Sequence, residues 1–102
     1  MASTIHSIKC DPRPFQDVWG DRKKAALRYN DRNYQPGDLI NLRETLYSAA
    51  QRGDSAAEYT GREIDVWITH VLKSTDGDDG YGLLKNWCVI SFKIGAIREG
   101  AE

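Results

Sequence analysis

Alternating apolar and polar residues form the clearest pattern in the chain, in the segment Glu63 to Lys73, E-I-D-V-W-I-T-H-V-L-K. A period of two is that of a strand with one buried face. The apolar positions on this face are Ile64, Val66, Ile68 and Leu72. His70 falls on the same face, so the pattern predicts a partly buried, hydrogen-bonded histidine there. A second strand is predicted from Trp87 to Ile94, which is rich in β-branched and aromatic residues.

A short helix is predicted from Arg13 to Trp19. Asp11 can cap its N-terminus, Pro12 suits the first turn, and Gly20 would end it. The apolar residues of this segment have the i, i+3, i+4 spacing of one helix face; they are Phe15, Val18 and Trp19.

Two further strands are predicted on either side of a turn. Lys24 to Tyr29 is the first and Asp38 to Thr45 the second. Between them, Pro36 and Gly37 occupy the central positions typical of a type II turn. Several strands, one helix and short connections predict a mostly β fold of the α+β class, a small β-barrel with an accessory helix.

Composition is that of one ordinary globular domain: 102 residues, 40% hydrophobic and 28% charged, without internal repeats or linker-like segments. We therefore expect a single domain over residues 1–102. Cys10 and Cys88 share no metal-binding or redox spacing, which predicts reduced, packed thiols and a cytoplasmic protein. No signal peptide or membrane-length apolar run is present, so no membrane partner is expected.

The net charge of −1 argues against coating nucleic acid through bulk electrostatics. The charge is nevertheless uneven, because Met1 to Arg43 has eight Lys/Arg against five Asp and the remainder has six against ten acids. A local basic face is therefore predicted. The sequence has no serine-protease-type order, phosphate-binding loop, metal motif or cofactor motif, and neither a metal nor a cofactor is expected.

Polar residues that suit nucleotides cluster in the first two-thirds of the chain. Arginine offers a fork of donors to phosphate or a base edge, and tyrosine offers a ring for stacking. The candidate ligand-binding residues are Lys9, Arg28, Asp31, Arg32, Tyr59, Thr60 and Arg62. Arg22, Lys23 and Lys24 belong to the same cluster. Together they predict a nucleotide-sized pocket.

A purely structural interpretation of the same segment stays open. Asp31 and Arg32 could pair to fix the turn before Pro36, Asn30 could adopt a left-handed conformation, and Tyr34 could belong to the core. In that case the polarity of the segment would serve folding rather than binding.

Four motifs together resemble a known family: H-x-I-K at 6–9, F-x-x-V-W-G at 15–20, N-D-R-N-Y-Q-P-G-D at 30–38 and Y-T-G-R-E at 59–63. The resemblance, over about residues 5 to 94, is to a small bacterial and phage family of unknown function related to the ASCH domains of the PUA-like superfamily. It implies a PUA-like barrel with a helix over a cleft, and binding of RNA, a nucleotide or a modified nucleoside.

Some ASCH proteins are hydrolases that remove an acyl group from a modified cytidine or cleave RNA. Their G-x-K-x-x-E-x-R motif places Lys23 on the lysine and Arg28 on the arginine, so the resemblance makes Lys23 a candidate catalytic residue. Ala26 stands where the motif has its glutamate. Without that acid, Lys23 lacks the expected partner for acid–base chemistry, and Glu63 or Asp31 would have to replace it.

Three functions therefore remain open. The first is a module that binds RNA or a nucleotide, and the second is a small amidohydrolase or ribonuclease acting at the same cleft. The third is a phage protein that binds a host protein, through an acidic surface that includes D-G-D-D-G at 76–80.

Overall fold

The computed structural model describes residues 4–75 and 80–100. Their backbone is mostly β, with two helices and a short 3₁₀ turn. In chain order the elements are β1 (Ile5–Cys10), α1 (Pro12–Trp19), β2 (Ala25–Tyr29), β3 (Leu39–Thr45), α2 (Ala49–Arg52), β4 (Tyr59–Lys73), the turn Gly80–Gly82 and β5 (Trp87–Arg98). The predicted mostly β composition with an accessory helix is confirmed.

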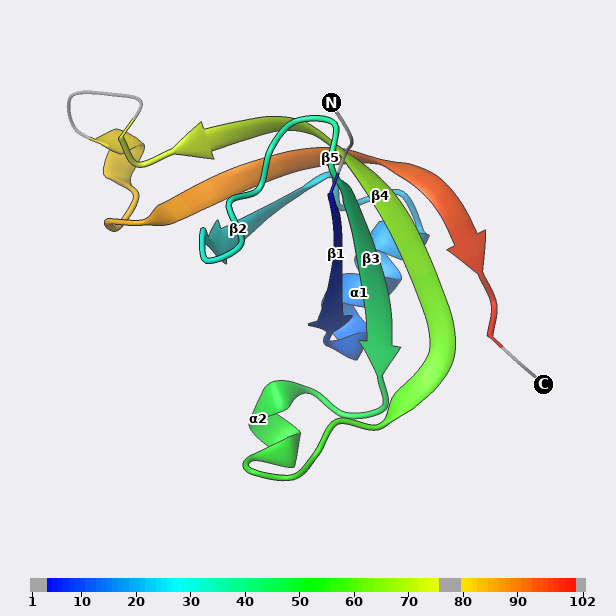
Figure 1. Cartoon of the computed structure of the whole chain (residues 1–102). Coiled ribbons are helices and arrows are strands. Elements are labelled where there is room, and N and C mark those ends of the chain that lie inside the picture. Colours follow the sequence, from blue (N-terminus) through cyan, green and yellow to red (C-terminus); the bar gives the residue numbers. More distant parts are fainter. Residues whose placement is uncertain (1–3, 76–79, 101–102) are drawn as a thin grey trace.

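The described strands form one five-stranded sheet in the order β1-β3-β4-β5-β2. β1 runs parallel to β3, and the other neighbours are antiparallel. The long strands β4 and β5 bend, so the sheet curls into a half-barrel (Figure 1). Strands β1 and β2 are its two edges, which means that the predicted barrel is present as an open half.

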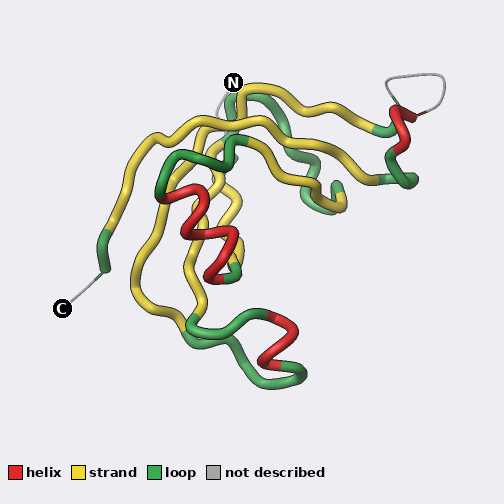
Figure 2. Tube along the Cα trace, turned by 180° about the vertical axis from the view of Figure 1, so that it is seen from behind, coloured by secondary structure: helices red, strands yellow, loops and turns green. Residues whose placement is uncertain are grey.

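Helix α1 lies across the hollow side of this sheet (Figure 2). Phe15 and Val18 are its buried residues, at 0% and 2% exposure, and they complete the core. The rest of the core comes from Tyr34, in the segment between β2 and β3, and from one face of the sheet: Ile8, Ile40, Leu42, Ile64, Val66, Ile68, Val71, Cys88, Ile90 and Phe92. Packing a helix against the concave face buries the apolar residues of the alternating strands without closing the barrel.

The four predicted strands and the helix are all present, with β4 and β5 longer than expected. β1 was not predicted, because its inward positions are His6, Ile8 and Cys10, and a histidine and a cysteine weaken the apolar alternation. The short helix α2, between β3 and β4, was not predicted either. Its start carries a capping box between Ser48 and Gln51.

A bulge in β4 overturns the predicted environment of His70. Ile68 pairs with Phe92 but His70 pairs with Ser91, so the register shifts between them. The extra residue exchanges the two faces of the strand beyond this point. Val71 is therefore buried at 7%, and His70 is exposed rather than partly buried.

The predicted type II turn is confirmed. The Asp38 N–H donates to the Gln35 carbonyl at 3.0 Å, and Gly37 has the φ of 91° that this position requires. The Asp38 carboxylate is buried and accepts from His6 Nε2 at 2.9 Å and from two backbone N–H groups. Although burial raises the pKa of Asp38, these hydrogen bonds hold it below its usual value.

Two local predictions need correction and one is confirmed. Tyr34 is a core residue, with no exposed area. Asn33, not Asn30, takes the left-handed conformation, with a φ of 50°. Asp11 precedes α1 but makes no side-chain cap there; its Oδ1 accepts instead from the Ala49 N–H of α2 at 3.1 Å.

Candidate ligand-binding cavity

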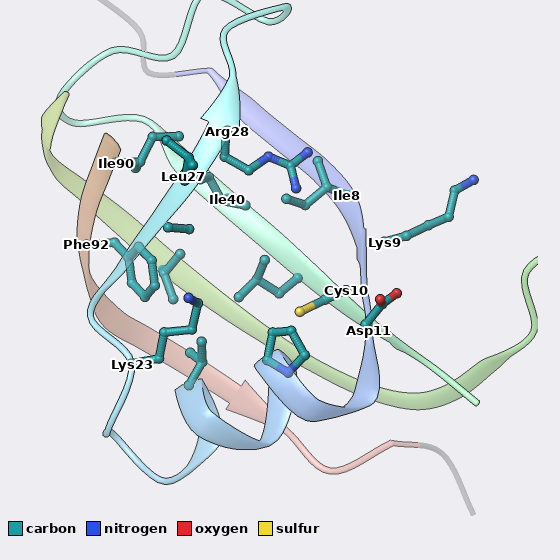
Figure 3. Close-up of a pocket in the computed structure, with 15 residues that line it drawn as sticks. Ile8, Lys9, Cys10, Asp11, Lys23, Leu27, Arg28, Ile40, Ile90 and Phe92 are labelled. Atoms are coloured by element: carbon teal, nitrogen blue, oxygen red, sulfur yellow. The ribbon is translucent and has the colours of Figure 1, made fainter. Parts of the chain in front are cut away.

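A cavity of about 420 Å³ lies between the two open edges of the half-barrel (Figure 3). Small-molecule sites in proteins span roughly 300–1,000 Å³. Its walls come from β1, β2 and α1, and its floor is the apolar face of the sheet. The floor residues are Ile8, Ile40, Leu42, Val66, Ile90 and Phe92. Such a floor suits a flat or hydrophobic part of a ligand.

Two cationic side chains enter the cavity from different segments. Arg28 extends from β2 toward Ile8 on β1, and Lys23, in the segment before β2, points its ammonium group inward (Figure 3). Register explains the inward direction of Arg28, because it pairs with the buried Cys88 on the concave face of the sheet. In the described part of the chain neither Arg28 nor Lys23 forms an ion pair.

Lys9 and Asp11 also line the cavity, but in another way. The side chain of Lys9 points away from it in Figure 3. Asp11 is the acidic residue of the lining, and its carboxylate is held by α2. The cationic character of the cavity interior therefore comes from Lys23 and Arg28.

Cys10 lies in the β1 wall and is half-buried, with a free thiol. Burial, with a smaller effect from the negative charge of Asp11, raises the pKa of this thiol to about 11 against the opposing effect of Arg28. The thiol is therefore protonated at neutral pH. A thiolate nucleophile is thus absent from the cavity under these conditions. Cys88 is buried and free as well, and burial raises its pKa.

Thr60 and Arg62 form a separate group around a buried carboxylate, here called the Glu44 cluster (Glu44, Thr60 and Arg62). Arg62 donates to Glu44 through Nε at 2.8 Å and Nη2 at 2.7 Å, and Thr60 Oγ1 donates at 2.7 Å. The guanidinium also lies 4.6 Å from the ring centroid of Trp19. The hydrogen bonds from Arg62 lower the pKa of Glu44 and raise that of Arg62.

The Glu44 cluster joins α1 to the sheet and does not line the cavity. The Thr60 hydroxyl and the Nε and Nη2 atoms of Arg62 donate to Glu44, and Nη2 also donates to Gln16 of α1 at 3.2 Å. Thr60 and Arg62 of the Y-T-G-R-E motif therefore make structural contacts in this fold, which the sequence could not separate from a binding role.

The other candidate residues lie outside the cavity lining. Arg32 is exposed and donates to the Ser7 carbonyl on the edge of β1 at 3.2 Å. Asp31 is exposed, and no ion pair joins it to Arg32 within residues 4–75 and 80–100. Tyr59 stacks against Arg43, whose guanidinium carbon lies 3.9 Å from the ring centroid. The structure thus brings Lys9, Lys23 and Arg28 together at one cavity and places the remaining candidates elsewhere.

Glu63 cannot serve Lys23 from its position in this structure. Its carboxylate accepts from Asn41 at 2.9 Å and from Arg98 at 3.3 Å, within a polar network that also includes Asp65. Register places these residues on the face opposite the buried Ile64 and Val66.

The cavity lining also contains Asp11 and Cys10, which the sequence did not single out as site residues. The alternation of His6, Ile8 and Cys10 was the signal that could have placed Cys10 in an inward-facing strand.

A metal-binding cluster and a membrane-spanning helix are both absent from residues 4–75 and 80–100. Within this part of the chain, no three His, Cys, Asp or Glu side chains come close enough to hold a metal ion. None of its helices has the length and apolar character needed to cross a bilayer. The acidic tract 76–80 lies almost wholly outside the described residues.

Comparison with known proteins places the chain in a family. Residues 5–92 match the family model described as "Domain of unknown function (DUF3850)". The chain is also 32% identical over 84 residues to "Uncharacterized 12.9 kDa protein in GpA 3'region" of Escherichia phage P2, a match that covers 82% of this chain and 69% of the relative. A phage relative agrees with the resemblance to a bacterial and phage family. The matched region contains β1 to β4, the helices α1 and α2 and the first half of β5, so the chain belongs to the DUF3850 family.

Proposed function

We propose that the cavity binds a nucleotide, either free or as one unit of a single-stranded RNA. The observation that carries this proposal is the pair of cationic side chains, Lys23 and Arg28, entering an apolar-floored cavity without a carboxylate partner in the described part of the chain. A cation that is half-buried and unpaired is available to an anionic ligand.

The chemistry of the cavity matches the parts of a nucleotide. The guanidinium of Arg28 can donate two parallel hydrogen bonds to phosphate, and Lys23 adds a point charge. The apolar floor can support the face of a base. The resemblance to ASCH domains, with the PUA-like relationship that it implies, supports the same ligand class. Free thiols at Cys10 and Cys88 support a reducing cytoplasm as the place of action.

Thermal-shift and calorimetric titrations with nucleosides, mononucleotides, modified cytidines and short single-stranded RNAs test this proposal, because a ligand of the native state raises its stability. Replacing Arg28 by Ala is expected to weaken binding about 10- to 100-fold, as for the loss of charge-assisted hydrogen bonds. Arg13→Ala is the matched control, since Arg13 is exposed on α1 outside the cavity lining. Equal affinity in both variants would remove the cavity as the site.

Cys10 provides a second measurement that does not depend on melting. Its thiol borders the cavity, and with a pKa of about 11 its alkylation should accelerate roughly tenfold per unit of pH up to that value. A bound nucleotide should slow alkylation at pH 9, monitored by mass spectrometry. Unchanged labelling of Cys10 at saturating ligand would place the ligand elsewhere.

A hydrolase remains the second candidate, because Lys23 points into the same cavity. If the bound ligand is turned over, Lys23→Ala should lower kcat at least about 100-fold, as for the loss of a general acid or base. Turnover by Lys23→Ala equal to that of the parent would contradict this role. If no ligand is found while the protein melts cooperatively, a stoichiometric partner recovered from bacterial lysate would favour the host-protein hypothesis instead.

A further inference from the structure

Two residues line the cavity although their side chains do not point into it, and both lie on sheet edges. The first is Leu27 of β2, whose side chain is 57% exposed. The Phe92 N–H donates to the Lys24 carbonyl at 3.0 Å and the Asn30 N–H to the Asn86 carbonyl at 2.8 Å. Even-numbered residues of this strand thus turn their peptide groups toward β5. Because peptide groups alternate along a strand, the N–H and C=O of Leu27 point to the open edge.

The same parity holds on the opposite wall for Lys9 of β1. The Leu39 N–H donates to the Thr4 carbonyl at 2.9 Å, which directs even-numbered residues of β1 toward β3. The Ser7 carbonyl points outward and accepts from Arg32. The N–H and C=O of Lys9 therefore also point to the open edge, while its side chain points away (Figure 3). Each wall of the cavity thus presents a main-chain donor and acceptor.

Neighbouring edge groups are already occupied, which limits what can bind. On β1 the Ser7 carbonyl is taken by Arg32, and on β2 the Tyr29 carbonyl accepts from the Asp31 N–H at 2.9 Å. An extended peptide needs several successive free edge groups to add as a strand. Here α1 also connects the end of β1 to the start of β2 and closes that side. The geometry favours a compact ring with adjacent donors and acceptors over an added strand.

Resting on the function proposed above, we propose that the cavity reads the base of the nucleotide through the peptide groups of Lys9 and Leu27. The base lies on the apolar floor between the two edges, and its hydrogen-bonding edge pairs with both peptide groups, accepting from the Leu27 N–H. Lys23 and Arg28 are left for the phosphate. The ligand is then selected by its base and not only by its charge.

A proline at position 27 removes the N–H without removing a cavity side chain. Proline is tolerated on edge strands where the N–H faces outward. Leu27→Pro is expected to weaken binding of the best of the four ribonucleoside 5′-monophosphates about tenfold or more, because a hydrogen bond to the base is lost. Ala25→Pro, the matched control, removes an outward-facing N–H of the same edge strand outside the cavity lining and should bind as the parent does. Equal binding by both variants would overturn the inference.

A measurement on the parent protein decides the question even if Leu27→Pro fails to fold. In ¹⁵N-labelled protein, the amide signals of Lys9 and Leu27 should shift on titration with the monophosphates and stay unchanged with ribose 5-phosphate, which lacks a base. Ribose 5-phosphate binding as tightly as every monophosphate would refute base recognition while leaving the cation pair as the binding site. No binding by any of these probes, with RNA oligonucleotides also inert, would overturn the proposed function itself.

Discussion

Arg62 and Arg28 lie beside the same core but differ in whether an acidic side chain pairs with them. Arg62 meets the carboxylate of Glu44 through two nitrogens and lies over the ring of Trp19. Arg28 extends into a cavity and has no ion-pair partner in the described residues. Arg62 therefore holds α1 on the sheet, whereas the N–H donors of Arg28 remain available to a ligand.

The difference comes from what lies opposite each side chain. Glu44 is 6% exposed, so Arg62 neutralises a carboxylate that would be costly to bury alone. The carboxylate of Asp11, which borders the cavity, is occupied by α2. In this fold, the arginine beside a buried acid makes structural contacts, and the arginine without one keeps its donors.

Removing the acid from the Glu44 cluster should have the largest effect on stability. Glu44→Ala leaves Arg62 without its partner and is expected to lower the free energy of unfolding by about 3 kcal/mol, as for one partner of a buried pair. Urea denaturation measures this. Arg98→Ala, which removes a half-exposed partner of Asp65, should cost under about 1 kcal/mol. Equal losses would show that burial does not distinguish the two pairs.

Acid should weaken the Glu44 cluster by a smaller amount. The hydrogen bonds from Arg62 lower the pKa of Glu44 in the folded state below 4.5, its ordinary value. This contribution to stability is therefore complete above pH 4.5 and is lost as the pH falls through the lowered value. Glu44→Gln should show a flatter decline of unfolding free energy in this range than the parent. Asp38, whose pKa is also lowered, remains in both proteins.

A conservative change at Arg62 should have an intermediate effect. Lysine keeps the charge but loses the two-nitrogen contact with Glu44 and the planar contact with Trp19. Arg62→Lys is expected to cost about 1–2 kcal/mol of unfolding free energy. A melting curve identical to that of the parent would mean that charge alone holds the cluster.

The smallest effect on stability is expected at the cavity. Arg28→Ala removes no ion pair within the described residues and should change the free energy of unfolding by no more than about 0.5 kcal/mol. Combined with the loss of ligand binding expected above, this would separate a binding arginine from a structural one. A loss comparable to that of Glu44→Ala would show that Arg28 also holds the fold.

The sequence predicted the strands well where the alternation was apolar, as from Glu63 to Ile68. It failed at His70 because a bulge changes the register without leaving a mark in residue type. β1 was missed because His6 is buried through a hydrogen bond to Asp38, a partner 32 positions away. A local pattern of apolar and polar residues cannot reveal a hydrogen-bond partner so distant in sequence.

The candidate site was predicted in part for a related reason. Lys23 and Arg28 lie in one short segment, and strand parity alone turns Arg28 inward. The structural tasks of Thr60 and Arg62 depend on Glu44, which is distant in sequence. Every residue type has the same main-chain groups, so the sequence does not mark those of Lys9 and Leu27. Only the order of the strands shows that these two residues lie on open edges.

The order of the strands also sets when the cavity can appear during synthesis. Its two walls are close in sequence, yet β1 is held by β3 while β2 is held by β5, the last described strand. Such distant pairings form late, because the intervening chain must first be ordered. On a ribosome, the β2 wall stays unsupported until β5 has emerged, so a ligand that needs both walls would recognise the chain only after β5 has been made.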